Sequence, residues 1–287
     1  MEIVKSVDWL NENLERDSVR IIDCRFDLKN LDAGTEWYKE GHIPNSVYFH
    51  LEKDLSNPVT DHGGRHPLPA IEEFVSKLEN IGIGQETIVI AYDNGEGAFS
   101  GRLWWLLDYL GHTNTYILDG GYKEWVNKDF PISKEVPTFT KSTFSPAIQS
   151  HMIATYEDVA AQVKAKEEDK VLIDSREFKR YIGEIEPIDK KSGHIPGAIN
   201  FVWTEGLKNG FFLSTNEQKE RFSSLDPRKE YIVYCGSGIT ATPNYISLKM
   251  AGLEKVKLYP GSFSDWISYD ENDIETCLPN KIAKEQR

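Results

Sequence analysis

The sequence predicts an α/β fold that is built twice, as two tandem domains that each contain a mainly parallel sheet flanked by helices. One set of landmarks recurs once, with a period of about 150 residues, which is the mark of a duplicated unit. Within each copy, short β-rich runs alternate with helix-length segments, and parallel strands need such crossover connections. A chain of 287 residues also matches about two domains at roughly 150 residues each.

The landmarks follow one another in the same order in both halves. The first half carries RIIDCR (20–25), GHIPNSVYF (41–49), TIVIAYDNGEG (87–97) and LDGGYKEW (118–125). The second half carries VLIDSR (171–176), GHIPGAINF (193–201), YIVYCGSGIT (231–240) and LYPGSFSDW (258–266). Between the copies, prolines and hydroxyl residues break any regular period. We therefore expect one domain at 1–130, a linker at 131–150 and a second domain at 151–287.

Individual elements are predicted from composition and period. The runs IVIAY (88–92) and YIVYC (231–235) are strands, whereas RLWWLLDYL (102–110) and TPNYISLKM (242–250) have the length of helices. Each GHIP segment is a turn, because proline pushes the preceding isoleucine out of helical geometry. Ligands of such folds bind beyond the carboxyl ends of the strands.

Charge and cysteine content limit the possible partners. With 33 Lys+Arg against 46 Asp+Glu, the net charge of −13 repels polyanions, so we expect no nucleic-acid partner, and an anionic ligand needs a local cationic cluster. No segment resembles a signal peptide or a membrane span. Three widely separated cysteines fit a reducing compartment, so we expect a cytoplasmic protein without disulfides, and their spacing predicts no metal site.

The segment that carries chemistry surrounds Cys235, which ends a strand directly before a loop and a helix. Backbone N–H groups of this loop, together with the positive end of the following helix, favour the thiolate, which is the reactive form of a cysteine nucleophile. We therefore predict Cys235 as the nucleophile. The loop residues expected to bind substrate beside it are Gly236, Gly238, Ile239 and Thr240, with Ser237 as a catalytic hydroxyl.

The matching loop of the first half has Asp93 in the place of Cys235. A carboxylate in this place offers no thiol nucleophile, so we expect one reactive site per chain. Asp93 is instead predicted to cap the helix that follows it.

These residues resemble the tandem-domain rhodanese-type sulfurtransferases, and the loop CGSGITA (235–241) in particular is similar to that of the 3-mercaptopyruvate branch. The resemblance extends from about Trp9 to Trp266. It implies two rhodanese-like domains, of which only the second is catalytic, and no cofactor. It also implies that Cys235 takes a sulfane sulfur from a small anionic donor, 3-mercaptopyruvate or thiosulfate, and passes it from a persulfide to a thiol or cyanide.

The resemblance also implies a site for the donor's anionic group. The family's substrate-binding arginine matches Arg180 in DSREFKRYIG (174–183), and Arg176 lies on the same segment. An arginine fork suits a carboxylate or sulfonate because it donates two parallel hydrogen bonds. Mercaptopyruvate enzymes usually carry a second arginine further on, where this sequence has Asp189, Lys190 and Lys191. Thiosulfate enzymes usually carry Arg-Lys directly after the cysteine, where this sequence has Gly-Ser.

A serine–histidine–aspartate relay proposed for the mercaptopyruvate branch maps onto Ser237, His42 and Asp32. Such a relay would move the proton that pyruvate gains as the C–S bond breaks. The alternative for His42 is a structural turn histidine, because His194 occupies the same place in the other GHIP segment. A further family loop, DHGGRHPLP (61–69), adds local positive charge through His62, Arg65 and His66, and we predict Arg65 as a substrate-binding residue.

Three other functions stay open at this point. One is a rhodanese that prefers thiosulfate, and a second is a persulfide-relay module for a protein partner. The third is a cysteine phosphatase or arsenate reductase, which would need an arginine to close the loop, and residues 236–242 contain none. The oligomeric state and the physiological acceptor have no signal in the sequence.

Overall fold

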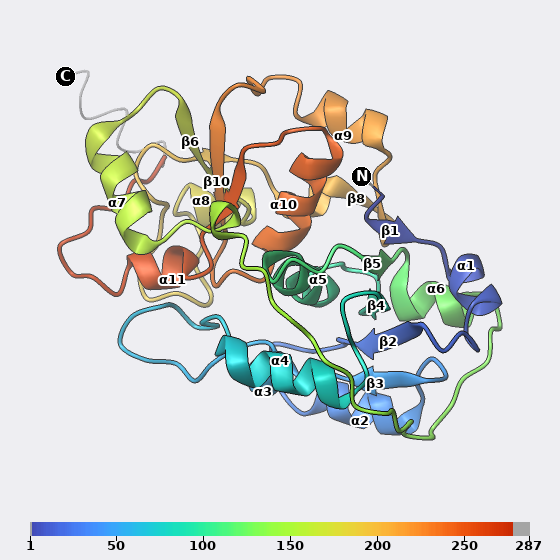
Figure 1. The fold of residues 1–287 in the computed structure, drawn as a ribbon. Helices are drawn as coiled ribbons and strands as arrows, with labels where there is room; N and C mark the ends of the chain where they lie inside the picture. The colour runs from blue at the N-terminus through green and yellow to red at the C-terminus, as the bar shows by residue number, and fades with distance from the viewer. Residues whose placement is uncertain (1, 278–287) are drawn as a thin grey trace, which may run out of the picture. The chain divides into compact units, whose positions relative to one another are not determined.

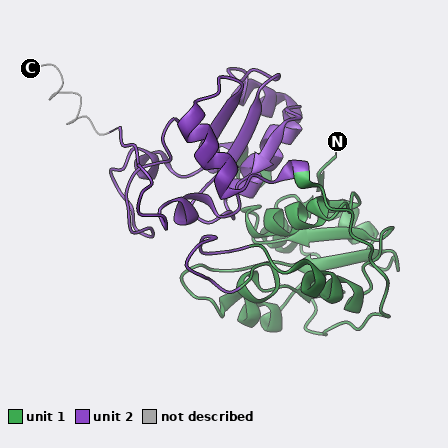
Figure 2. Ribbon diagram, turned by 60° about the vertical axis from the view of Figure 1, so that its left-hand side comes forward, with its two compact units in different colours: residues 1–57, 68–150, 207–213 green, residues 58–67, 151–206, 214–287 purple. Residues whose placement is uncertain are grey.

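The computed structural model describes residues 2–277, which form two compact units (Figure 2). Among the described residues, unit 1 comprises 2–57, 68–150 and 207–213, and unit 2 comprises 58–67, 151–206 and 214–277. Segment 58–67 belongs to unit 2 although its place in the sequence is within the expected first domain, and segment 207–213 belongs to unit 1 although its place is within the expected second domain. The proline-rich stretch 131–150 runs with unit 1, where for example the Ala147 amide donates to the carbonyl of Leu110.

Within the described residues, unit 1 is built on a five-stranded parallel sheet (Figure 1). All of its neighbouring strands pair in parallel. The strand order is β1 (Val4–Lys5), β5 (Thr115–Leu118), β4 (Ile88–Tyr92), β2 (Val19–Asp23) and β3 (Ser46–Tyr48). A short antiparallel pair, β8 (Leu207–Lys208) and β9 (Phe211–Phe212), also belongs to this unit.

Helices cover both faces of this sheet because alternate residues of its central strands are buried on opposite sides. Apolar side chains of α1 and α6 share one core with residues of β2 and β4. Helix α5 packs against β4 and β5. The helices of unit 1 are α1 (Val7–Glu12), α2 (Ala33–Glu40), α3 (Leu51–Asp54), α4 (Ile71–Asn80), α5 (Phe99–Tyr109) and α6 (Gly121–Asn127).

Unit 2 repeats this design with a four-stranded parallel sheet in the described residues, in the order β11 (Val256–Leu258), β10 (Glu230–Tyr234), β6 (Lys170–Asp174) and β7 (Ile199–Asn200). Helices α7 and α11 share a core with β6 and β10, and α10 packs on β10 and β11. The helices are α7 (Tyr156–Ala165), α8 (Phe178–Tyr181), α9 (Thr215–Arg221), α10 (Ala241–Met250) and α11 (Ser262–Trp266), with 3-10 turns at Ser150–Met152 and Trp203–Gly206. The predicted α/β fold is therefore confirmed.

A buried ion pair ties each GHIP turn to the sheet. At the end of β2, the Arg25 guanidinium donates to both carboxylate oxygens of Asp23 and, at 2.8 Å, to the carbonyl of Gly41. At the end of β6, Arg176 binds Asp174 in the same way and donates to the carbonyl of Gly193 at 2.6 Å. The aspartate and arginine of the two repeated landmarks thus have the same structural role in both units.

Three buried histidines make the stability of the fold depend on pH. Burial lowers the pKa of His50, His112 and His194, so the unfolded chain binds protons more readily than the folded one. Their contribution is complete above the ordinary histidine pKa of about 6.5 and is lost as the pH falls below it. We expect a lower urea midpoint at pH 5.5 than at pH 7.5, and a smaller difference in His112→Gln. The control is His151→Gln, at an exposed position. If both variants reduced the difference between the two urea midpoints equally, the explanation would be contradicted.

Candidate active site

The predicted nucleophile, Cys235, directly follows β10 and is 1% exposed. The backbone N–H of Gly238 donates to its sulfur, with 3.2 Å between N and Sγ. Gly238 has φ +76°, and a Cβ there would collide with the carbonyl oxygen of Pro260, so only glycine fits this loop. The loop therefore holds the sulfur against a backbone donor at the carboxyl end of the sheet, close to the first turn of α10.

The first residues of α11 form hydrogen bonds that fix the backbone of this loop. The Ser262 hydroxyl accepts the N–H of Cys235 at 3.1 Å, and the amides of Phe263 and Ser264 donate to the carbonyls of Cys235 and Gly236. These contacts explain why the landmark LYPGSFSDW follows the cysteine loop in the repeat. Its residues fix the backbone that presents the sulfur.

The equivalent loop of unit 1 holds an anion of its own, the carboxylate of Asp93. Its two oxygens accept hydrogen bonds of 2.9–3.2 Å from four backbone amides and one hydroxyl, those of Gly95, Gly97, Phe99 and Ser100. The helices α5 and α10 begin at Phe99 and Ala241, in each case six residues after Asp93 or Cys235. Asp93 therefore caps α5, as predicted, and the loop type is suited to an anion.

Ser237 lies beside the nucleophile and bonds to a histidine from a distant segment. Its hydroxyl oxygen is 2.8 Å from Nδ1 of His66, and both side chains are buried. His66 comes from segment 58–67, which belongs to unit 2. The sequence marked His66 only as a source of positive charge, because the chain separation of 171 residues hides the pairing.

The relay residues His42 and Asp32 lie in unit 1. His42 is buried, and its two ring nitrogens face the carbonyl oxygens of Tyr38 and Glu135 at 2.6 and 3.0 Å. Its ring stacks on Tyr38, just as its twin His194 stacks on Tyr181. Asp32 is the exposed N-cap residue of α2. These contacts favour the structural alternative for His42, because both of its nitrogens are used by backbone carbonyls.

Two arginines converge on the residue that follows the nucleophile. A Cβ added to Gly236 would lie 2.9 Å from an amino nitrogen (Nη2) of Arg65 and 3.5 Å from that of Arg180. Both arginines bind Asp189, and Arg180 also donates to both oxygens of Glu186, at 3.1 and 2.8 Å. Arg65 and Arg180 thus form a cationic pair beside Gly236 of this loop. Such a pair is suited to binding a carboxylate or a sulfonate.

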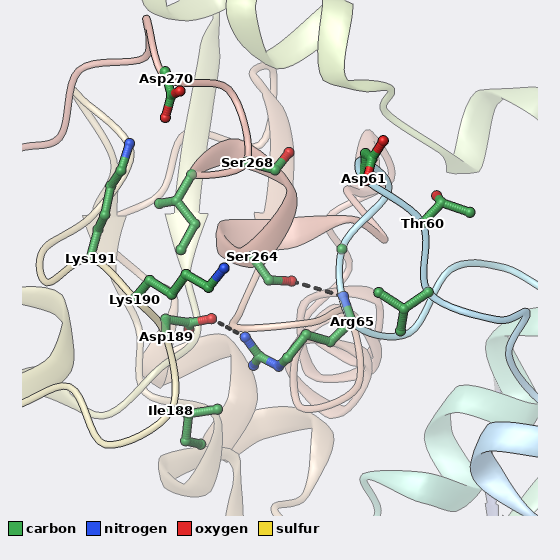
Figure 3. Close-up of a pocket in the computed structure, with 13 residues that line it drawn as sticks. Thr60, Asp61, Arg65, Ile188, Asp189, Lys190, Lys191, Ser264, Ser268 and Asp270 are labelled. Atoms are coloured by element: carbon green, nitrogen blue, oxygen red, sulfur yellow. Dashed lines mark hydrogen bonds and ion pairs between the residues drawn. The ribbon is translucent and has the colours of Figure 1, made fainter.

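The pKa of Arg65 reflects its position near both Arg180 and Cys235. Burial lowers the pKa of Arg65, and the positive charge of Arg180 adds to that effect, whereas the charge of Cys235 acts in the opposite direction. A cavity of about 450 Å³ opens beside Arg65 and Asp189 (Figure 3). It is lined by Arg65, Asp189, Lys190 and Lys191 together with residues of segments 59–64 and 264–270.

Arg176, the other arginine predicted to bind the donor, is held by groups of the protein itself. This side chain is 1% exposed, and its guanidinium is used by Asp174, by the carbonyl of Gly193 and, at 3.2 Å, by Glu186. It also lies over the ring of Phe263. The pattern Asp-Ser-Arg at a strand end therefore marks a structural ion pair, and Arg180 is the less buried of the two arginines.

The other loop residues contribute through the backbone. Ile239 is buried, and its carbonyl accepts from the Thr242 hydroxyl at 2.8 Å. Thr240 is the N-cap residue of α10 and uses no side-chain capping bond. Gly236 leaves the space that Arg65 and Arg180 approach. Substrate binding by these residues stays a prediction.

Within residues 2–277, no group of three or more histidine, cysteine, aspartate or glutamate side chains is arranged to hold a metal ion. In the same range, no helix combines the length and apolar character that a membrane crossing requires.

A cysteine in a donor-lined loop at the carboxyl end of a parallel sheet, under a pair of arginines, defines an enzyme that transfers a group through its sulfur. Comparison with known proteins gives a narrower answer. The family model described as "Rhodanese-like domain" matches residues 6–128 and 155–269. The chain therefore belongs to the rhodanese family, and it is a tandem-domain sulfurtransferase.

Known relatives align with nearly the whole length of this chain. The Pseudomonas aeruginosa protein named "Probable 3-mercaptopyruvate sulfurtransferase" is 37% identical over 273 residues, which cover 93% of this chain and 95% of that protein. The 3-mercaptopyruvate sulfurtransferase of Mus musculus is 32% identical, covering 91% and 90% of the two chains. The crystal structure of SseA from Escherichia coli, from work on 3-mercaptopyruvate sulfotransferases, has a TM-score of 0.81 and 30% identity, and the match covers 92% of this chain and 100% of that one.

Proposed function

We propose that this sulfurtransferase takes sulfur from 3-mercaptopyruvate, stores it as a persulfide on Cys235 and passes it to a small thiol or cyanide. The single observation that carries the choice of donor is the hydrogen bond of 2.8 Å between Ser237 and His66, in the loop of the nucleophile. The names of the relatives support the same donor.

In the first half-reaction, the Cys235 thiolate attacks the sulfur of 3-mercaptopyruvate. The new S–S bond forms as the C–S bond breaks, and the electron pair of the C–S bond goes to carbon, which leaves as the enolate of pyruvate. Arg65 and Arg180 hold the carboxylate of the donor, and the Gly238 amide stabilises the negative sulfur. The enolate needs one proton, which the Ser237 hydroxyl can deliver because His66 can replace it.

In the second half-reaction, a thiolate or cyanide attacks the outer sulfur of the persulfide. The S–S bond breaks, its electron pair returns to the sulfur of Cys235, and the acceptor leaves as a persulfide or as thiocyanate. No external oxidant or reductant enters the cycle. The carbon that leaves with the electron pair of the C–S bond is reduced as the thiol sulfur of the donor is oxidised to the sulfane level, and the second half-reaction passes on that sulfane sulfur without further change.

The hydroxyl–imidazole pair distinguishes the two donors chemically. Thiosulfate releases sulfite, which needs no proton on carbon, so the pair contributes little to that reaction. We therefore expect a higher kcat/KM for 3-mercaptopyruvate than for thiosulfate in the same preparation. We also expect Ser237→Ala to lower the kcat/KM for 3-mercaptopyruvate by about a hundredfold, the lower end of general acid–base effects, with a much smaller effect on the kcat/KM for thiosulfate.

The matched control for this test is Ser264→Ala, which removes a hydroxyl near the same loop that accepts from the Arg65 amide instead of facing His66. It is expected to change both donors by a similar factor. A wild-type preference for thiosulfate would instead support the thiosulfate-preferring alternative, and an equal loss for both donors in Ser237→Ala would contradict the proton transfer assigned to this pair.

A further inference from the structure

We propose that Asp189 is an internal anion that occupies the binding position of Arg65 and Arg180, and that the donor's anionic group has to displace it. Asp189 thereby sets the affinity of the site for anionic donors. The inference rests on the proposed function, since it names the group against which the donor's anionic end competes.

The contacts of Asp189 are those expected of a bound ligand. One carboxylate oxygen accepts from Arg65 and the other accepts from Arg180 at 2.9 Å, so a single carboxylate bridges both guanidinium groups. This carboxylate is 1% exposed. Its oxygen Oδ2 would also lie 3.5 Å from a Cβ at Gly236, directly beside the residue that follows the nucleophile. An anionic donor that reaches Cys235 from this direction meets the same two arginines.

Two neighbouring carboxylates differ in how firmly they are held. Glu186 is bound by Arg176 as well as Arg180 and accepts two backbone N–H groups, those of Ile188 and Asp189. For the carboxylate of Asp189, the described residues provide the two arginines as partners. Asp189 also lines the open cavity next to Lys190, whereas Glu186 does not (Figure 3). Glu186 is thus part of the fixed scaffold, and Asp189 is the carboxylate placed to exchange with a ligand.

The charges of Arg65 and Arg180 explain why the Asp189 carboxylate lies between them. The positive charges of Arg65 and Arg180 lie close enough for Arg180 to lower the pKa of Arg65, although burial is the larger cause. Two like charges near each other are unfavourable without a counter-anion. Because Asp189 is attached to the same chain, it competes with a free anion at a high effective concentration.

The test compares two variants that each remove one negative charge from the same cavity. Asp189→Asn removes the carboxylate that bridges the arginines, whereas Asp270→Asn removes one that lines the cavity at an exposed position. For Asp189→Asn we expect KM to fall about tenfold for both 3-mercaptopyruvate and thiosulfate, the lower end for one charge-assisted contact, with kcat changed less than about twofold. For Asp270→Asn we expect KM within about twofold of wild type.

Inorganic sulfate at constant ionic strength provides a readout that does not depend on which donor is preferred. Its inhibition constant against thiosulfate is expected to fall about tenfold in Asp189→Asn, and in Asp189→Ser as a second variant. If the protein prefers thiosulfate, the proposed function fails while this result still stands. An unchanged or higher KM in Asp189→Asn, or an equal fall in Asp270→Asn, would overturn the inference. If neither Asp189 variant folds, the carboxylate is a core group that no ligand displaces, and the inference fails as well.

Discussion

Cys235→Ser is expected to lower sulfur transfer by at least about three orders of magnitude with either donor, because the attacking sulfur is gone and a serine hydroxyl does not form a persulfide. The fold should be unaffected, since the hydroxyl can still accept the Gly238 amide that now points at Sγ. The measurement is kcat/KM for both donors, together with mass spectrometry of donor-treated protein. In wild type, the mass increase of one sulfur atom is expected on the peptide that contains Cys235.

The other two cysteines provide the controls. Burial raises the pKa of Cys24 well above its ordinary value, and the nearby charges of Asp23 and Asp93 raise it further, so this thiol stays protonated and unreactive. Cys277 is exposed and lies near the end of the described residues, far along the chain from any donor-lined loop. Cys24→Ser and Cys277→Ser are expected to keep most of the activity. A stable persulfide on either of them would refute the assignment of Cys235.

Arg176→Met is expected to lower the free energy of unfolding of unit 2 by about 3–5 kcal/mol, the usual cost of leaving one partner of a buried ion pair without the other. Burial works against the charge of Arg176, yet its contacts with Asp174 and Glu186 hold its pKa above the ordinary value. Without the arginine, the completely buried Asp174 loses its bidentate partner, and the Gly193 carbonyl loses its donor.

The readout is urea unfolding, accompanied by the KM of the folded variant. The double variant Asp174→Asn with Arg176→Met removes both charges and is expected to recover a large part of the lost stability. The twin substitution Arg25→Met should cost a similar amount, because Arg25 binds Asp23 and Gly41 in the same way. A stable Arg176→Met protein with a KM raised tenfold or more would instead restore the donor-binding role expected from the sequence.

The fold followed closely from the sequence because its signals are local or repeated. The run that ends at Tyr234 is a strand by composition alone, and the predicted loop follows Cys235 directly, with Gly238 at a positive φ. The duplication then predicts the second sheet from the first. The same local logic identified Asp93 as a cap, because a carboxylate before a helix faces free amide groups.

The rest of the site depends on contacts between segments that are far apart in the chain. His66 reaches Ser237, and Arg65 reaches Asp189, from a segment with no regular period that belongs to unit 2. Nothing in such a loop indicates its neighbours, so the sequence suggested His42 for the relay on the basis of a family pattern. The ion pair of Arg176 was missed for another reason. Its spacing from Asp174 places the two side chains in contact, which motif matching alone does not reveal.

The Asp93 carboxylate, which fills the loop of unit 1, also determines which of the two loops can take up sulfur. Asp93 already accepts the amides that would otherwise face a sulfur atom, so that loop is permanently occupied by part of its own chain. Of the two equivalent loops, the loop of unit 2 is therefore the one whose side chain, the Cys235 thiol, can take up sulfur, and the duplicated unit 1 carries the fold of a carrier without its load.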